Sequence, residues 1–96
     1  MTAYALINVE ITNPSAMREY AQGVGATVAA YGGEYLVRAG AAMEIAEGDW
    51  TPKTVIVIKF ESIARANAWL NSPEYAPLKH IRHENAKSQM IFVEGV

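Results

Sequence analysis

The sequence contains no cysteine. Disulfide bonds, thiol nucleophiles and thiolate metal sites are therefore excluded, and the chain has to fold without covalent cross-links, which fits a reducing compartment. The chain also lacks a basic N-terminal stretch followed by an apolar run, and no apolar run approaches the roughly 20 residues that a membrane helix needs. The sequence therefore predicts a cytoplasmic protein without a membrane partner.

Clusters of basic residues are missing as well. Eight Lys and Arg residues are interspersed among ten Asp and Glu residues, and the formal net charge is −2. A protein that binds nucleic acid needs a basic patch that displaces counterions from the phosphates. Nucleic acid is therefore not an expected partner.

The composition that remains is typical of a globular domain. The 96 residues are 51% hydrophobic and 19% charged, a balance far from that of disordered chains. A chain of this length supports one hydrophobic core. Residues 1–96 are therefore predicted to form a single domain.

Residue patterns predict strands and helices in the order βαββαβ. Apolar and polar residues alternate over residues 3–11, and β-branched residues fill residues 54–60, so both segments are expected to be strands. Two further strands are expected over residues 34–39 and 87–94. Residues 41–53 are expected to form an irregular arm or an extra hairpin.

The helix boundaries are predicted from capping residues. Asn13 is expected to be the N-cap of the first helix, with Pro14 in its first turn and Gly32 at its end. Ser62 is expected to cap the second helix. Ser72 is expected to open a short third helical segment in the same way.

This order of elements predicts an α+β fold of the ferredoxin-like kind, with an antiparallel sheet and helices on one face. The residues expected on the helix-covered face are Ile7, Val9, Ile56, Ile58, Phe60, Ile91 and Val93. The opposite face is expected to show Tyr4, Leu6, Val57, Met90 and Phe92, mixed with Asn8, Glu10, Lys59 and Glu94. Because large exposed apolar patches mark interaction sites, we expect a homodimer that packs sheet against sheet, with a cavity at that interface.

Several short motifs occur together along the chain. They are Tyr31-Gly32-Gly33, Leu36-Val37-Arg38, Glu47-Gly48-Asp49-Trp50, and Ala68-Trp69 with Ser72-Pro73-Glu74-Tyr75. In this order they resemble domain-of-unknown-function family 1330, over essentially the whole chain. The resemblance implies membership of the dimeric α+β barrel superfamily, in which two ferredoxin-like protomers pack sheet against sheet. It implies no particular activity.

Arg38 is the main candidate for binding a ligand. It lies in a predicted strand between apolar neighbours, and its guanidinium can hold a carboxylate or a phosphate through a fixed fork of donors. The alternative is a structural ion pair with Glu10, Glu34 or Glu94. The sequence alone leaves both interpretations open.

Three further residues are expected to contribute to the same cavity. Tyr20 and Tyr75 offer phenol donors, although a tyrosine in a helical apolar stripe also serves as core packing. Asn8 offers an amide from the first strand. Members of the family often carry an acid at the position of Asn8, and this difference weakens an acid or base role there.

The two histidines lie three residues apart on a predicted helix. His80 and His83, followed by Glu84, have a spacing that a divalent metal can use, but no further histidine or cysteine exists to complete the site. A solvated helix surface explains the segment as well, and we predict neither a metal site nor a cofactor. His80 is retained as a candidate general base, because histidine titrates near neutrality.

An enzymatic alternative comes from analogy within the superfamily. Haem-degrading monooxygenases of this fold use a strand-one Asn, a helix-two Trp and a His about ten residues later. Asn8 and Trp69 fit that pattern, but the tenth residue after Trp69 is Lys79, and His80 follows it. One residue rotates a side chain by about 100° around a helix, which weakens the analogy.

Three functional hypotheses follow from these residues. The first is a homodimer that binds a small polar or anionic molecule in a cavity at the sheet interface, with Arg38 as its anchor. The second is a cofactor-independent or haem-type monooxygenase, or an isomerase, with Asn8, Tyr75 and His80 around its substrate. The third is a structural dimerisation module without a ligand. The sequence leaves open whether the protein is an enzyme.

Overall fold

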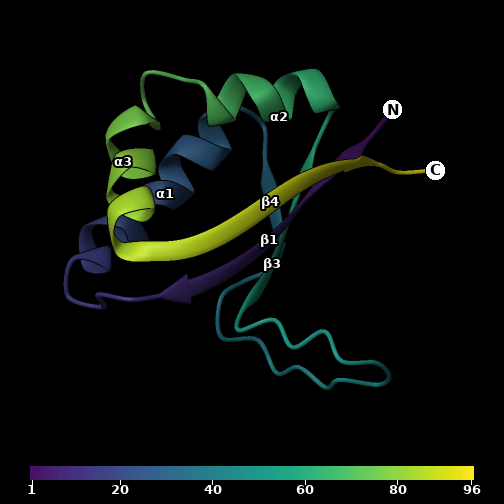
Figure 1. Cartoon of the computed structure of the whole chain (residues 1–96). Helices are drawn as coiled ribbons and strands as arrows, with labels where there is room; N and C mark the ends of the chain where they lie inside the picture. The colour runs from purple at the N-terminus through teal and green to yellow at the C-terminus, as the bar shows by residue number, and fades with distance from the viewer.

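A computed structural model describes residues 1–96 and shows one four-stranded sheet with three helices. The elements in chain order are β1 (Ala3–Ile11), α1 (Met17–Ala30), β2 (Glu34–Val37), β3 (Val55–Phe60), α2 (Ile63–Leu70), α3 (Ala76–Asn85) and β4 (Ala86–Glu94). The sheet has the order β2-β3-β1-β4, and every neighbouring pair is antiparallel. All three helices lie on one side of the sheet (Figure 1). The predicted ferredoxin-like α+β fold is therefore confirmed.

The strands follow the sequence patterns closely, and of the three predicted caps only Asn13 was wrong. Ser62 caps α2 as expected, since its Oγ accepts a hydrogen bond from the amide of Arg65 at 3.1 Å. Asn13 does not cap α1, because its Oδ1 accepts from the Ser15 hydroxyl at 3.1 Å, and the helix begins only at Met17.

The segment after α2 forms a separate turn before α3. The Ser72 Oγ accepts from the Tyr75 amide at 3.2 Å, and its hydroxyl donates to the Trp69 carbonyl at 2.8 Å. These bonds close a turn, and α3 starts at Ala76, later than predicted. Pro77 then lies in the first turn of α3, where its missing amide hydrogen costs little.

The helix-covered face of the sheet is built from alternate residues of β1 and their cross-strand partners. Residues directly opposite in an antiparallel pair project to the same face. Ala5 and Ile7 are buried, and they lie opposite Phe92 and Met90 of β4. Both bulky partners are partly buried and pack against the hydrophobic core.

The predicted facing of β4 was therefore wrong. Ile91 and Val93 are on the open face, where they are 58% and 42% exposed, and Met90 and Phe92 are on the helix-covered face. Four consecutive apolar residues carry no alternation that distinguishes the two faces. Because side chains of a strand alternate with a period of two, an error of one residue exchanges the faces.

Trp69 of α2 is the centre of the aromatic core. It is fully buried, its ring centroid lies 4.4 Å from that of Tyr75 and 5.6 Å from that of Phe60, and its Nε1 donates to Thr27 Oγ1 at 3.1 Å. Thr27 belongs to α1, and its hydroxyl in turn donates a hydrogen bond to the Val24 carbonyl at 2.7 Å. One indole therefore joins α2, α1 and the sheet.

Gly33 follows α1 at a position where a side chain does not fit. A Cβ atom there would lie 2.5 Å from Val28 Cγ1 and 2.8 Å from Phe60 Cε1. We expect Gly33→Ala to lower the free energy of unfolding by about 1–3 kcal/mol, because overpacking displaces buried side chains.

Gly25→Ala is the matched control for this prediction. No atom lies within 4 Å of a Cβ built at this helical position, so the variant is expected to gain roughly 0.5–1 kcal/mol from helix propensity. Urea denaturation measures both free energies. A Gly33→Ala protein as stable as the unmodified one would contradict the packing argument.

The segment between β2 and β3 contains no helix or strand and extends away from the rest of the molecule (Figure 1). Its large apolar side chains are exposed, Met43 by 48%, Ile45 by 50% and Trp50 by 70%. Of the two predicted forms for residues 41–53, the irregular arm is confirmed, and no extra hairpin forms.

The two ends of the chain lie side by side (Figure 1). The amide of Gly95 donates to the carbonyl of Thr2 at 2.7 Å, which extends the pairing of β1 with β4 to the termini. None of the three helices has the length and apolar character needed to cross a membrane.

Candidate functional site

A mostly apolar cavity of about 370 Å³ lies between α1 and the helix-covered face of the sheet. Its walls come from β1, β3 and α1, with residues such as Ile7, Ile56 and Val24. Helix α1 packs mainly against α3 and makes few close backbone contacts with the strands, which leaves this space open. The cavity therefore lies on the opposite side of the sheet from the interface where the sequence analysis expected one.

Arg38 is the only charged residue that lines this cavity. Its guanidinium carbon lies 4.6 Å from the centroid of the Tyr35 ring, and Tyr35 also lines the cavity. The predicted alternative was an ion pair with Glu10, Glu34 or Glu94 across the sheet or the dimer, and within the chain no carboxylate lies within 4 Å of Arg38. The guanidinium is exposed and has its donors free for an anion.

Tyr20 and Tyr75 meet beside the same cavity. Tyr20 lines it, and the Tyr20 hydroxyl lies 2.7 Å from the hydroxyl of Tyr75, which is fully buried behind it. The two rings pack edge to face with centroids 6.1 Å apart. Burial raises the pKa of both phenols, so both remain protonated and neutral at neutral pH.

Arg82 is a second cation on this side of the sheet, and the sequence analysis assigned it no function. It is 5% exposed, and it donates from one terminal nitrogen to Ser88 Oγ at 2.9 Å and from the other to His83 Nε2 at 3.2 Å. Its Nε has no partner, and no carboxylate pairs with it. Burial and the charge of Arg82 lower the pKa of His83, which keeps that imidazole neutral and able to accept.

A sequence signal for the burial of Arg82 exists in retrospect. Arg82 lies four residues after Leu78 and seven after Tyr75, so it continues the buried stripe of α3. Its polar neighbours Lys79 and His83 concealed this stripe.

Asn8 is separated from these residues by the sheet. It lies on the open face, where its side-chain amide donates to Gln89 Oε1 at 3.2 Å and its Oδ1 accepts from the Lys53 amide at 3.1 Å. It lines a second, polar hollow of about 470 Å³ that also includes Glu10 and His83. Asn8 therefore ties the base of the arm to the sheet and does not share the cavity of Arg38.

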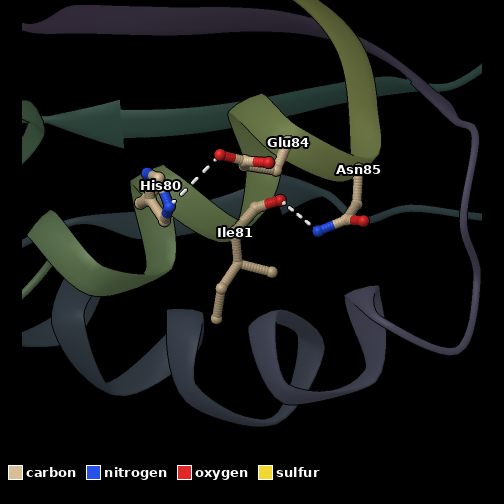
Figure 2. A network of polar contacts seen from close by, with 4 residues as sticks. All are labelled: His80, Ile81, Glu84 and Asn85. Carbon is tan, nitrogen blue, oxygen red and sulfur yellow. Dashed lines mark hydrogen bonds and ion pairs between the residues drawn. The ribbon is translucent and has the colours of Figure 1, made fainter.

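His80 lies on the exposed surface of α3. Figure 2 shows its ring pointing toward Glu84, with the Nε2 to Oε1 distance at 3.3 Å, while Asn85 donates to the carbonyl of Ile81 on the same helix. The side chains of His80 and Glu84 are 74% and 62% exposed. The structure therefore shows His80 in a surface contact of neighbouring helical turns.

The residues of the haem analogy do not come together. Asn8 is on the open face, Trp69 is fully buried among aromatic rings on the other side, and His80 is on the outer surface of α3. No cluster of three or more His, Asp or Glu side chains with metal-binding geometry occurs in the chain. Of the predicted site residues, the structure groups Arg38, Tyr20 and Tyr75.

Solved structures with the same fold have little sequence in common with this chain. RPA0582, a protein of unknown function from Rhodopseudomonas palustris, superposes with a TM-score of 0.73 at 19% identity, covering 99% of this chain and 82% of that one. A dimeric protein of unknown function with a ferredoxin-like fold from Bacteroides fragilis gives 0.67 at 13% identity, covering 98% and 96%. SnoaB from Streptomyces nogalater, a cofactor-independent oxygenase, gives 0.52 at 13% identity, covering 99% and 91%.

The family of the chain follows from its sequence. No curated protein matches it closely enough to count as a relative. A family model does match, and it spans residues 2–96, which include the motifs that suggested the resemblance. The chain belongs to the family described as Domain of unknown function (DUF1330).

Proposed function

We propose that this protein binds a small anionic molecule with an apolar or aromatic body in the cavity between α1 and the sheet. The observation that supports this proposal is the single charged residue of the cavity, Arg38, which has no carboxylate partner in the chain. A cation without a counter-ion beside an apolar wall favours a ligand that brings the negative charge itself.

The electrostatics around the cavity favour the same class of ligand. No acidic side chain lines it, and the buried cation Arg82 also lacks an acidic partner. The protein as a whole carries a net charge of −2, so this region differs in sign from the average surface. The aromatic ring of Tyr35 under the Arg38 guanidinium holds the cation in place through a cation–π contact.

We further propose that the protein works as a homodimer in which two open sheet faces pack together. The open face carries Leu6, Leu36, Ile91 and Val93, which are 38%, 49%, 58% and 42% exposed. A two-fold axis covers such a face with an identical copy of itself. The dimeric ferredoxin-like protein from Bacteroides fragilis supports this arrangement by analogy of fold.

The proposed binding site is tested by removing the cation. In titrations followed by NMR, 4-isopropylbenzoate is expected to bind the unmodified protein, and its uncharged amide to bind more weakly. Arg38→Ala is expected to weaken binding of the carboxylate by roughly tenfold or more, because a hydrogen bond to a charged group contributes about 1.5–3 kcal/mol.

Arg65→Ala is the matched control for Arg38→Ala. Arg65 also lies over a tyrosine ring, with its guanidinium carbon 5.2 Å from the centroid of Tyr31, but it does not line the cavity. Its removal is expected to leave the affinity unchanged. If the amide bound to the unmodified protein as tightly as the carboxylate, or if Arg38→Ala bound the carboxylate as tightly as the unmodified protein does, the proposed role of Arg38 would be wrong.

A further inference from the structure

The paired hydroxyls of Tyr20 and Tyr75 contain one more hydrogen-bond donor than they use. Each phenol hydroxyl has one proton, and the contact of 2.7 Å between the two oxygens uses one of the two protons. Neither hydroxyl donates to another side chain or to the backbone, and the Arg82 guanidinium near Tyr75 can only donate, so it uses neither proton. The second proton is therefore free to bind an acceptor from outside the chain.

The depth of the two hydroxyls determines which of them can offer its proton to a ligand. Burial raises the pKa of both phenols, so both protons are in place at neutral pH, and either oxygen can be the donor in the contact between them. Only Tyr20 lines the cavity. An acceptor in the cavity therefore selects the arrangement in which Tyr75 donates to the Tyr20 oxygen and the proton of Tyr20 points to the ligand.

Tyr20 is also the member of the pair that a ligand can reach. It is partly buried and lines the cavity, whereas Tyr75 is fully buried behind it and does not. The cavity also contains the hydroxyl-bearing residues Tyr35 and Thr54. Arg38 is exposed where the arm leaves the sheet and Tyr20 is partly buried, so these two residues differ in depth. Arg38 is at the outer end, and the hydroxyl of Tyr20 is at the inner end.

We propose that the Tyr20 hydroxyl donates a hydrogen bond to a carbonyl oxygen of the ligand whose carboxylate pairs with Arg38. The ligand class is then an oxo acid, with a carboxylate at one end of an apolar body and a ketone or aldehyde at the other. This inference rests on the proposed function, because it places a second contact in the same cavity. Tyr75 is a positioning residue, because by donating to the Tyr20 oxygen it leaves the Tyr20 proton for the ligand.

Two ligands of nearly equal shape distinguish the contact with Arg38 from the contact with Tyr20. Both 4-acetylbenzoate and 4-isopropylbenzoate offer a carboxylate to Arg38, but only the acetyl compound has a carbonyl oxygen for Tyr20. The unmodified protein is expected to bind 4-acetylbenzoate roughly fivefold to tenfold more tightly, the range of one net hydrogen bond. Tyr20→Phe is expected to remove this preference and to leave the affinity for 4-isopropylbenzoate unchanged.

Tyr4→Phe is the matched control, because Tyr4 lies on the open face opposite Val93 and its hydroxyl makes no hydrogen bond. The Tyr4→Phe variant is expected to keep the full preference for 4-acetylbenzoate over 4-isopropylbenzoate. Equal affinities for the two ligands in the unmodified protein, or an undiminished preference in Tyr20→Phe, would overturn the inference and leave the Arg38 site standing. Failure of both carboxylates to bind would overturn the proposed function and the inference with it.

The positioning role of Tyr75 has a separate readout. Tyr75→Phe is expected to reduce the preference for 4-acetylbenzoate in the unmodified background and to have no further effect on it in Tyr20→Phe. A purely structural role for Tyr75 would weaken both ligands equally in both backgrounds, and that result would refute the oriented pair. Circular dichroism of each variant confirms that the compared proteins are folded.

Discussion

Leu6→Lys is expected to convert the proposed homodimer into monomers. Leu6 lies on the central strand β1, on the open face, directly opposite Ile91 of β4 and Val57 of β3. An ammonium group there would be taken out of water by the partner sheet without a counter-ion, at a cost of several kcal/mol. Because a two-fold axis doubles every substitution, each dimer would contain two such charges.

The expected loss of affinity is at least about 100-fold in the dimer dissociation constant, the equivalent of about 2.7 kcal/mol. Analytical ultracentrifugation over a range of protein concentrations measures it. Ala26→Lys is the control, since it adds the same charge at an exposed position of α1 on the other side of the molecule. A Leu6→Lys protein that sediments as a dimer, or an unmodified protein that is monomeric, would exclude the open face as the interface.

Trp69→Ala is expected to have the largest effect on stability. Its indole is fully buried between Phe60 and Tyr75 and holds the hydroxyl of Thr27 on α1. Truncation of a buried Trp typically costs about 3–5 kcal/mol, because it removes buried apolar area and leaves a cavity. The free energy of unfolding of a chain of this size is roughly 5–15 kcal/mol, so the variant is expected to lose a large part of its stability.

Two further variants separate the contributions to this loss. Trp69→Phe keeps an aromatic ring but removes the donor to Thr27, and it is expected to lose less stability than the alanine variant. Trp50→Ala makes the same truncation at a side chain that is 70% exposed, where a change within about 0.5 kcal/mol is expected. Similar unfolding midpoints for Trp69→Ala and Trp50→Ala in urea would disprove the central role of the indole.

The parts of the fold that the sequence predicted well depend on local pattern. In β1 the polar residues Asn8 and Glu10 alternate with the apolar residues Ile7, Val9 and Ile11, and the observed bounds of the strand are those predicted, Ala3–Ile11. Its cross-strand partner β4 has no such alternation from Met90 to Val93. The facing of β4 depends on which side chains fit opposite small residues such as Ala5, and that is decided by packing between distant segments.

The candidate site could be predicted in part for the same reason. Arg38 and Tyr20 were singled out by residue type, and the structure places both on one cavity. The location of that cavity was not predictable, because it depends on the distance at which α1 packs from the sheet. Arg82 was missed because most charged residues in a polar helical segment are solvated, and its partner Ser88 lies on the following strand.

The contact between the two ends of the chain has a consequence for the connectivity of the fold. Because Gly95 and Thr2 are hydrogen-bonded neighbours, a short linker can join residue 96 to residue 1 without disturbing the sheet. The arm of residues 41–53 has no helix or strand to interrupt, so new termini can be opened within it. The circularly permuted chain would start with β3 and end with β2, two strands that are neighbours in the sheet, and would keep every strand pairing.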